Sequence, residues 1–391
     1  MESQYIKIIS VNKSLPTVIA FSSVNTEAGK FKPYSILLAS EINIIFVNDF
    51  GNRWYQNGIK GLSESPETTA IELVKIGRKI GNGKVITFGT SMGAYGALLY
   101  CSLGGADGCL AFGVEPELGL PASRSKQYIL KNIKKTHPNL SPILTNNTSK
   151  LILFSSEMDE IDLMSAYRMA TNNIPNIRNI ILCGMDHPSV QIFHMDNTIG
   201  KLIKDFADTL EIHLPIPRES SITPNSKLIP KLYDSVKLKK ENNYNAWLSS
   251  LEEINKEFPK TAIVLSKLGE ARLKNNDDTG AISAWKQCIK ICDYQFEAHA
   301  KLGAIQRLKG KLDDAYHNLT KAISINPFGA HTYHTLGLLF QDKKNYPMAE
   351  INFRTATKIN PGNKSFKDSL KRFITEDIKR KQEEIKLISN E

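Results

Sequence analysis

The chain has 391 residues, of which 41% are hydrophobic and 23% are charged, and its formal net charge is +10. This length favours two domains, and the composition is that of globular protein with enough apolar residues for a sizeable core. The amino terminus lacks the basic and apolar regions of a secretory signal, and no apolar run reaches the roughly 20 residues of a membrane helix. Five cysteines, an odd number, predict free thiols in a reducing, cytoplasmic setting.

The positive charge predicts a basic surface that attracts phosphate or other anionic groups without identifying them. The sequence has no motif of the nucleic-acid-binding modules, so no nucleic-acid partner is expected. Cys288 and Cys292 lie four residues apart, but no cluster of His or Cys accompanies them. We therefore expect neither a metal site nor a bound cofactor.

Short apolar segments alternate with helical ones through the first half of the chain. Strands are expected at residues 5–10, 17–21, 42–47, 85–89, 108–113, 150–155 and 179–183. Helices are expected at residues 32–40, 65–80, 164–171 and 199–210, and directly after Ser91. This alternation predicts an α/β fold with a mostly parallel sheet, in which ligands bind at the carboxyl ends of the strands.

The segment from Gly89 to Gly93 has the pattern G-x-S-x-G, with Ser91 at its centre. In this pattern a strand enters a sharp turn before a helix, and the turn exposes the serine hydroxyl. Glycines on both sides allow the backbone to fold tightly around a strained serine. A serine hydroxyl is a poor nucleophile until a base removes its proton, so an acid and a base are sought at later strand ends.

Both partners are present in the order serine, acid, histidine. Asp159 and Asp162 follow the strand at 150–155, and His187 follows the strand at 179–183. The set resembles the catalytic triad of the α/β-hydrolase superfamily over roughly residues 5–213. The resemblance implies that Ser91 is the nucleophile and His187 the base. Asp159 is the preferred acid because it comes three residues after a small residue, and Asp162 is the alternative.

The same resemblance implies an oxyanion hole made of backbone N–H groups. Met92 supplies one donor, and Ser22 or Ser23, after the strand at 17–21, supplies the other. Trp54 and Tyr55 are candidates for stacking on a sugar or lining an acyl pocket, or else for wedging their loop onto the fold.

Arg124 is a candidate contact for an anionic substrate, with an exposed cation as the alternative. The neighbouring acidic residues Glu157 and Glu160 are expected to be solvated. The loop at Trp54 and the segment around Ser91 together resemble bacterial O-acetyltransferases and esterases of surface polysaccharides.

Residues 214–228 are rich in Pro and Ser and are expected to form a linker. Beyond them Leu-Gly pairs recur every 34 residues, at Leu268, Leu302 and Leu336, and buried-type alanines keep the same interval. A 34-residue period with these residues resembles tetratricopeptide repeats, which are pairs of helices. The resemblance implies a helical repeat domain over 229–391, whose charged last helix caps the array.

Three functions follow from these patterns. The first is a serine-dependent carboxyl-ester hydrolase acting on an acylated carbohydrate or small metabolite. The second is an O-acetyltransferase that uses the same triad, with acetyl-CoA as the acyl donor and a capsular polysaccharide as the acceptor. The third is a non-catalytic adaptor. In each case the repeats are expected to bind a protein partner or a large substrate.

Overall fold

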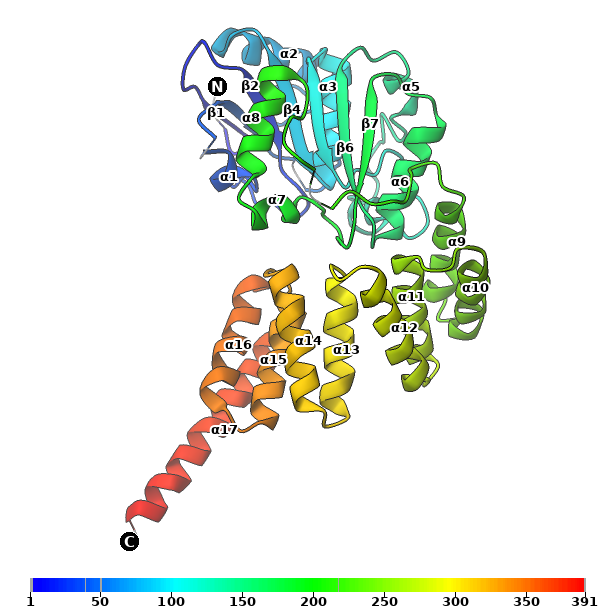
Figure 1. Cartoon of the computed structure of the whole chain (residues 1–391). Coiled ribbons are helices and arrows are strands. Elements are labelled where there is room, and N and C mark those ends of the chain that lie inside the picture. The colour runs from blue at the N-terminus through cyan, green and yellow to red at the C-terminus, as the bar shows by residue number, and fades with distance from the viewer. Residues whose placement is uncertain (1–2, 39, 50, 217, 390–391) are drawn as a thin grey trace. The chain divides into compact units, whose positions relative to one another are not determined.

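The computed structural model describes residues 3–38, 40–49, 51–216 and 218–389. Its contacts divide the chain into two compact units, Met1–Ile254 and Asn255–Glu391. The first unit contains a sheet with flanking helices, and the described residues of the second are helices and the turns between them (Figure 1). The mixed α/β class with a helical carboxyl-terminal region is therefore confirmed.

Seven strands form one sheet in the order β1-β3-β2-β4-β5-β6-β7. Strand β1 runs antiparallel to β3, and all other neighbouring pairs are parallel. Strands β2, β3 and β5 are buried at every residue, because helices cover both faces of the sheet. In chain order the strands are β1 (Ile6–Ile9), β2 (Thr17–Phe21), β3 (Asn43–Val47), β4 (Val85–Thr90), β5 (Gly108–Phe112), β6 (Lys150–Ser156) and β7 (Ile177–Leu182).

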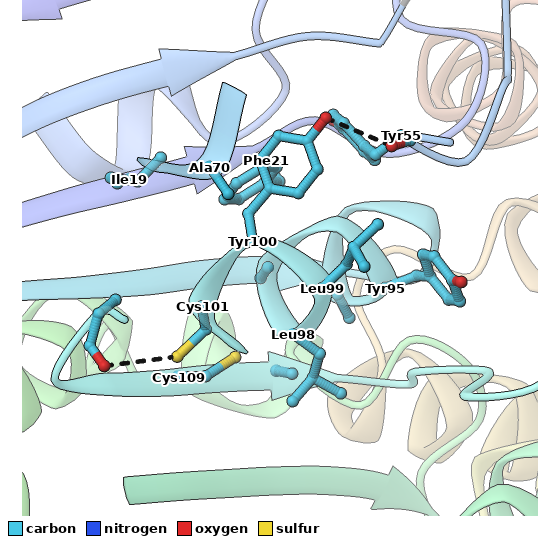
Figure 2. Packing of buried hydrophobic residues seen from close by; sticks show 14 of the residues in the cluster. Ile19, Phe21, Tyr55, Ala70, Tyr95, Leu98, Leu99, Tyr100, Cys101 and Cys109 are labelled. Carbon is cyan, nitrogen blue, oxygen red and sulfur yellow. Dashed lines mark hydrogen bonds between the residues drawn. The ribbon is translucent and has the colours of Figure 1, made fainter. Parts of the chain in front are cut away.

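Side chains alternate between the two faces along each strand, so β2 contributes to two apolar cores. Ile19 and Phe21 face helices α2 (Pro66–Ile80) and α3 (Met92–Gly104). Figure 2 shows Phe21 in this core, beside Tyr100 of α3. Val18 and Ala20 belong to the other core, which is covered by α1 (Tyr34–Leu38), α7 (Gln191–Met195) and α8 (Ile199–Thr209).

The remaining helices of the first unit come after β5 in the chain. Two short helices, α4 (Arg124–Tyr128) and α5 (Ser141–Leu144), lie in the long segment between β5 and β6. Helix α6 (Glu160–Thr171) follows β6 and packs against α9 (Leu228–Lys240), which precedes α10 (Tyr244–Glu257).

Residues 218–220 of the expected linker pair with the sheet. Their backbone adds to the outer edge of β7: the Cys183 N–H donates to the Arg218 carbonyl, and the Ser220 N–H donates to the Ile181 carbonyl. An edge strand presents unpaired N–H and C=O groups, which this segment satisfies. The division of contacts therefore falls at residues 254 and 255, later than the boundary at 213–229 expected from composition.

The second unit contains three helix pairs followed by a long helix. The pairs are α11 (Ala262–Lys274) with α12 (Asp278–Ile291), α13 (Phe296–Leu308) with α14 (Leu312–Ile325), and α15 (Ala330–Asp342) with α16 (Tyr346–Ile359). Helix α17 (Lys364–Ser389) packs against α16. This arrangement confirms the helical repeats expected from the 34-residue period.

The recurring glycines explain why the helices of each pair approach so closely. A Cβ atom on Gly269 would lie 2.5 Å from the Trp285 indole nitrogen, and one on Gly337 would lie 2.7 Å from the Phe353 ring. Gly303 meets Leu319 in the same way. Each glycine thus accepts a large side chain from the partner helix sixteen residues later, which links the sequence period to the packing.

Candidate active site

Ser91 lies at the point where the order of the strands reverses. The chain passes from β2 to β3 on one side and then returns to β4 on the other side of β2. In parallel sheets such a reversal opens a crevice at the carboxyl ends of the strands. Ser91 follows β4, and Ser22 and Ser23 follow β2, so all three come at the carboxyl ends of the strands beside this reversal.

The backbone of Ser91 is held in a conformation that serine rarely adopts. Its φ is 56° and its ψ is −121°, and it directly precedes the first residue of α3. Non-glycine residues with such angles cost about 1–3 kcal/mol and persist only where the surroundings impose them. The Ser91 N–H donates to the Phe112 carbonyl at 2.8 Å, which ties this turn to the end of β5.

The two glycines of the motif are required by close backbone contacts. A Cβ atom on Gly89 would collide with the Gly93 carbonyl, and one on Gly93 would collide with the Phe21 carbonyl at the end of β2. The turn therefore packs directly against the neighbouring strand. The motif folds as its sequence pattern predicts.

His187 forms a hydrogen bond with Asp162. The His187 Nδ1 atom lies 2.9 Å from the Asp162 Oδ1 atom, and both side chains are largely buried. The imidazole lies against Gly113, where an added Cβ would come within 2.6 Å of Nδ1. Gly113 follows Phe112, the residue that accepts the Ser91 N–H, so the histidine lies beside the serine turn.

The structure places Asp162 next to the histidine, and not Asp159, which the sequence analysis preferred. Asp159 is the N-cap of α6, where its carboxylate accepts the N–H groups of Ile161 and Asp162. Its other oxygen forms an ion pair with Arg124. Because both oxygens are engaged there, the expectation that Asp159 orients His187 is replaced by the alternative, Asp162.

The charges in this cluster lower the pKa of Asp159 and raise the pKa of His187. Burial opposes ionisation of Asp159, but the charges of Arg124 and His187 and the hydrogen bonds to its carboxylate together outweigh burial and lower the Asp159 pKa to about 2. Burial alone would lower the pKa of His187. The charge and the hydrogen bond of Asp162 act in the opposite direction, and the net pKa lies above the ordinary value of about 6.5. A histidine with this pKa is a competent proton acceptor at neutral to alkaline pH.

The backbone donors near Ser91 differ from the expected set. The Ser22 N–H donates to the Val47 carbonyl at 2.9 Å, so it extends the sheet and is not available to a ligand. Met92 is in the first turn of α3, where backbone N–H groups have no partner within the helix. Met92 and Ser23 are therefore the remaining candidates for an oxyanion hole.

Trp54 and Tyr55 are buried and do not present faces for a sugar. Their exposed fractions are 1% and 0%. The Tyr55 hydroxyl donates to the Ser22 carbonyl at 2.7 Å, and its ring fills the space beside Gly96 of α3. Figure 2 shows Tyr55 beside Tyr100, whose hydroxyl donates to the Tyr55 carbonyl. The structure therefore supports the alternative interpretation, in which Trp54 and Tyr55 wedge their loop onto the fold.

Arg124 is also a structural residue. Its guanidinium forms ion pairs with Asp159, with Asp162 at 3.4 Å and with Glu115 at 3.6 Å, and its side chain is 21% exposed. These three carboxylates raise its pKa although burial opposes the charge. The expected contact between Arg124 and an anionic substrate is therefore replaced by contacts within the protein.

Two buried acids were missed by the sequence analysis. Glu157, expected to be solvated, is only 4% exposed, and its carboxylate accepts the Gly184 N–H at 2.9 Å. Glu115 accepts the backbone N–H groups of Arg124 and Ser125 at the start of α4. No local pattern marks either residue, because the partners of each are far from it in the sequence.

Asp49, at the end of β3, is a further buried acid in this region. It accepts backbone N–H groups of residues 53–55, but burial raises its pKa to about 6. It lines a cavity of about 560 Å³ together with residues of the loop before α2, among them Arg53, Asn57, Lys60 and Glu64. Because the folded state binds this proton more tightly than the unfolded chain, the stability contributed by Asp49 is lost as pH rises from about 4 through 6.

We therefore expect Asp49→Asn to gain stability relative to the wild type as pH rises. The difference in the free energy of unfolding should grow by about 2 kcal/mol between pH 4 and pH 7, since each pKa unit is worth 1.36 kcal/mol. Urea denaturation across this pH range measures it, with Glu72→Gln on the exposed side of α2 as the control. A difference that stays constant with pH would contradict the assignment of a raised pKa to Asp49.

Two further classes of site are absent from the part of the chain that the structure describes. No group of three or more His, Cys, Asp or Glu side chains is placed to hold a metal ion. Across the same residues, no helix has the length and apolar character needed to cross a membrane.

Comparison with known proteins identifies one of the repeats. Residues 330–363, which form α15, α16 and the turn that follows, match the family model of the tetratricopeptide repeat. The chain thus contains a tetratricopeptide repeat. No curated protein matches the chain.

Several solved structures are similar to part of the chain. MamA 41-end from Desulfovibrio magneticus RS-1 is 17% identical, with a TM-score of 0.36, over 40% of this chain and 89% of that one. PilF of Pseudomonas aeruginosa is 13% identical, with a TM-score of 0.37, over 39% of this chain and 69% of that one. TTC0263, a thermophilic tetratricopeptide-repeat protein of Thermus thermophilus, is 21% identical, with a TM-score of 0.34, over 38% of this chain and 82% of that one.

Proposed function

We propose that the first unit is a serine-dependent acyl-transfer enzyme of the α/β-hydrolase type, and that the repeats bind a protein partner. The observation that carries the enzymatic part is the His187–Asp162 hydrogen bond beside the strained turn of Ser91. The strand order and the reversal between β2 and β4 support the same proposal. The tetratricopeptide match supports the binding part.

In this mechanism His187 accepts the proton of the Ser91 hydroxyl as the oxygen attacks an ester carbonyl. Asp162 orients the imidazole through Nδ1 and stabilises the imidazolium that forms. The backbone N–H groups of Met92 and Ser23 stabilise the negative charge on the carbonyl oxygen. His187 then returns the proton to the leaving alcohol, and an acyl group remains on Ser91.

Water or a sugar hydroxyl completes the reaction from the same acyl-enzyme. Attack by water gives a carboxyl-ester hydrolase, and attack by a hydroxyl gives an O-acetyltransferase. We place the hydrolase first, on an acylated carbohydrate or small metabolite, and the transferase that takes acetyl from acetyl-CoA second. Since Trp54 and Tyr55 are buried, the choice of a saccharide depends on the sequence resemblance and not on these rings.

A non-catalytic adaptor is the second candidate, and the match of the repeats to the tetratricopeptide family favours it. In that case the first unit serves as a scaffold, and Ser91 has no special reactivity. Labelling with a fluorophosphonate, which reacts with activated serines, distinguishes the two candidates.

We expect the wild-type protein to become covalently labelled at Ser91, as located by peptide mass spectrometry. Ser91→Ala and His187→Ala should not be labelled, because the first lacks the nucleophile and the second lacks the base. Ser102→Ala, which changes a serine on α3 whose hydroxyl bonds the Leu98 carbonyl, is the matched control and should be labelled normally. Equal labelling of all the variants, or none of the wild type, would favour the adaptor.

A further inference from the structure

Helix α9, the first helix after residues 214–227, contacts two other parts of the first unit that lead to Asp162. It packs against α6, the helix that contains Asp162. Its Tyr233 hydroxyl also donates to the Pro121 carbonyl at 2.6 Å, and the Lys240 amine donates to the Ala122 carbonyl at 3.0 Å. Tyr233 is only 5% exposed. Helix α9 therefore holds the loop that directly precedes Arg124.

The backbone of Arg124 is also fixed by Glu115. One Glu115 oxygen accepts the Arg124 N–H at 2.8 Å, and the other accepts the Ser125 N–H at 2.9 Å. Ser123 caps the same turn by accepting the Lys126 N–H. The start of α4 is thus bound both to the segment after β5 and, through residues 121 and 122, to α9.

From this fixed backbone the guanidinium reaches the two acids of α6. One Arg124 nitrogen pairs with Asp159, and the other lies 3.4 Å from the Asp162 Oδ1 atom. That same oxygen lies 2.9 Å from His187 Nδ1. The second Asp162 oxygen accepts the Ser156 N–H at 3.2 Å. Arg124 therefore shares its partner oxygen with the histidine.

We propose that Arg124 is a positioning residue for the His187–Asp162 pair, and that α9 keeps the arginine in place through the Tyr233 hydroxyl. The catalytic role of this arrangement rests on the proposed function. The effect of Tyr233 and Arg124 on the His187–Asp162 pair can be measured without catalysis. Through Arg124, the reactivity of Ser91 therefore depends on the position of α9.

The link predicts a measurable effect on the titration of His187. The charged groups facing the imidazole are Asp162 and Asp159 from α6 and Arg124 from α4, and Asp186 precedes it in its own loop. The two α6 carboxylates favour the imidazolium and Arg124 opposes it. If the guanidinium moves away from Asp162, the imidazolium is stabilised and the pKa of His187 rises.

The experiment is an NMR titration of the full chain with labelled histidine, in which His187→Gln identifies the signal. Tyr233→Phe removes only the hydroxyl that holds the loop. Tyr244→Phe is the matched control, because its hydroxyl bonds Asn242 beside its own helix. Arg124→Gln removes the cation, and Arg124→Lys keeps the charge but cannot bridge two carboxylates.

We expect Arg124→Gln to raise the pKa of His187 by about one pH unit or more and Tyr233→Phe to raise it by less. The alkaline shift should appear equally in the pH profile of fluorophosphonate labelling. If Arg124→Gln does not fold, Arg124→Lys takes its place, with a smaller rise expected because the charge is kept but no longer bridges the two carboxylates. An unchanged His187 pKa in folded Tyr233→Phe would overturn the proposal. Absence of labelling in the wild type would instead overturn the proposed function, while the titration would still test the link.

Discussion

Asp162→Asn should lower the rate of acyl transfer by about 10⁴-fold, the loss expected when the triad acid becomes an amide. The amide presents an N–H group toward His187 Nδ1 or forces the other tautomer, so Nε2 no longer accepts the serine proton. The rates of aryl-acetate hydrolysis and of fluorophosphonate labelling measure this effect. Asp162 is fully buried, so circular dichroism must show that the variant is folded.

Asp159→Asn is the matched control, because it changes the same chemical group three residues earlier. It weakens the ion pair with Arg124 and leaves the hydrogen bond of His187 in place. Asparagine caps helices about as well as aspartate, so the loss comes from the charge. We expect about 2 kcal/mol at neutral pH, since the pKa of Asp159 is about 2 against an ordinary value of 3.8, and only a small change in rate. A large loss of rate in Asp159→Asn, with near-normal rates in Asp162→Asn, would reverse the assignment of the acid.

Gly93→Ala should destabilise the first unit by about 3 kcal/mol or more. The added methyl group would collide with the Phe21 carbonyl, and a backbone obstacle cannot rotate away as a side chain can. The separation of β2 from the turn would have to increase, which also moves the Met92 and Ser23 N–H groups apart. Urea denaturation followed by a probe of the first unit measures the loss.

Gly200→Ala is the control for this substitution. Gly200 lies in the first turn of α8, and the nearest atom to an added Cβ there is 3.7 Å away, which is an ordinary contact. Since alanine favours helices over glycine, the control should gain up to about 1 kcal/mol. A loss as large as that of Gly93→Ala would show that the close approach to Phe21 is not the cause.

The parts of this molecule that depend on local pattern were predictable from the sequence. The strands are apolar runs of ordinary length, and the turn at Ser91 needs glycine at two fixed offsets for reasons that the backbone contacts explain. The repeats were predictable because Gly269, Gly303 and Gly337 each meet a side chain from a neighbouring helix. In these cases the residues that interact are close in sequence or recur periodically.

Which acid bonds His187, and whether Tyr55 is buried, depend on partners that are distant in the sequence. Asp159 and Asp162 differ by less than one helical turn, and what distinguishes them is that His187, which follows β7, bonds Asp162, whereas Asp159 caps α6. The burial of Tyr55 likewise depends on a space beside Gly96 in α3. Neither the spacing of the acids nor the aromatic character of the loop contains this information.

The pairing of residues 218–220 with β7 has a consequence for where the chain can be divided. A chain ending at residue 213 would leave the edge of β7 and the α9-facing side of α6 uncovered. Exposed strand edges recruit other chains, so such a fragment is expected to aggregate. A division near residue 254 keeps this cover, and α9 therefore belongs with the sheet and not with the repeats.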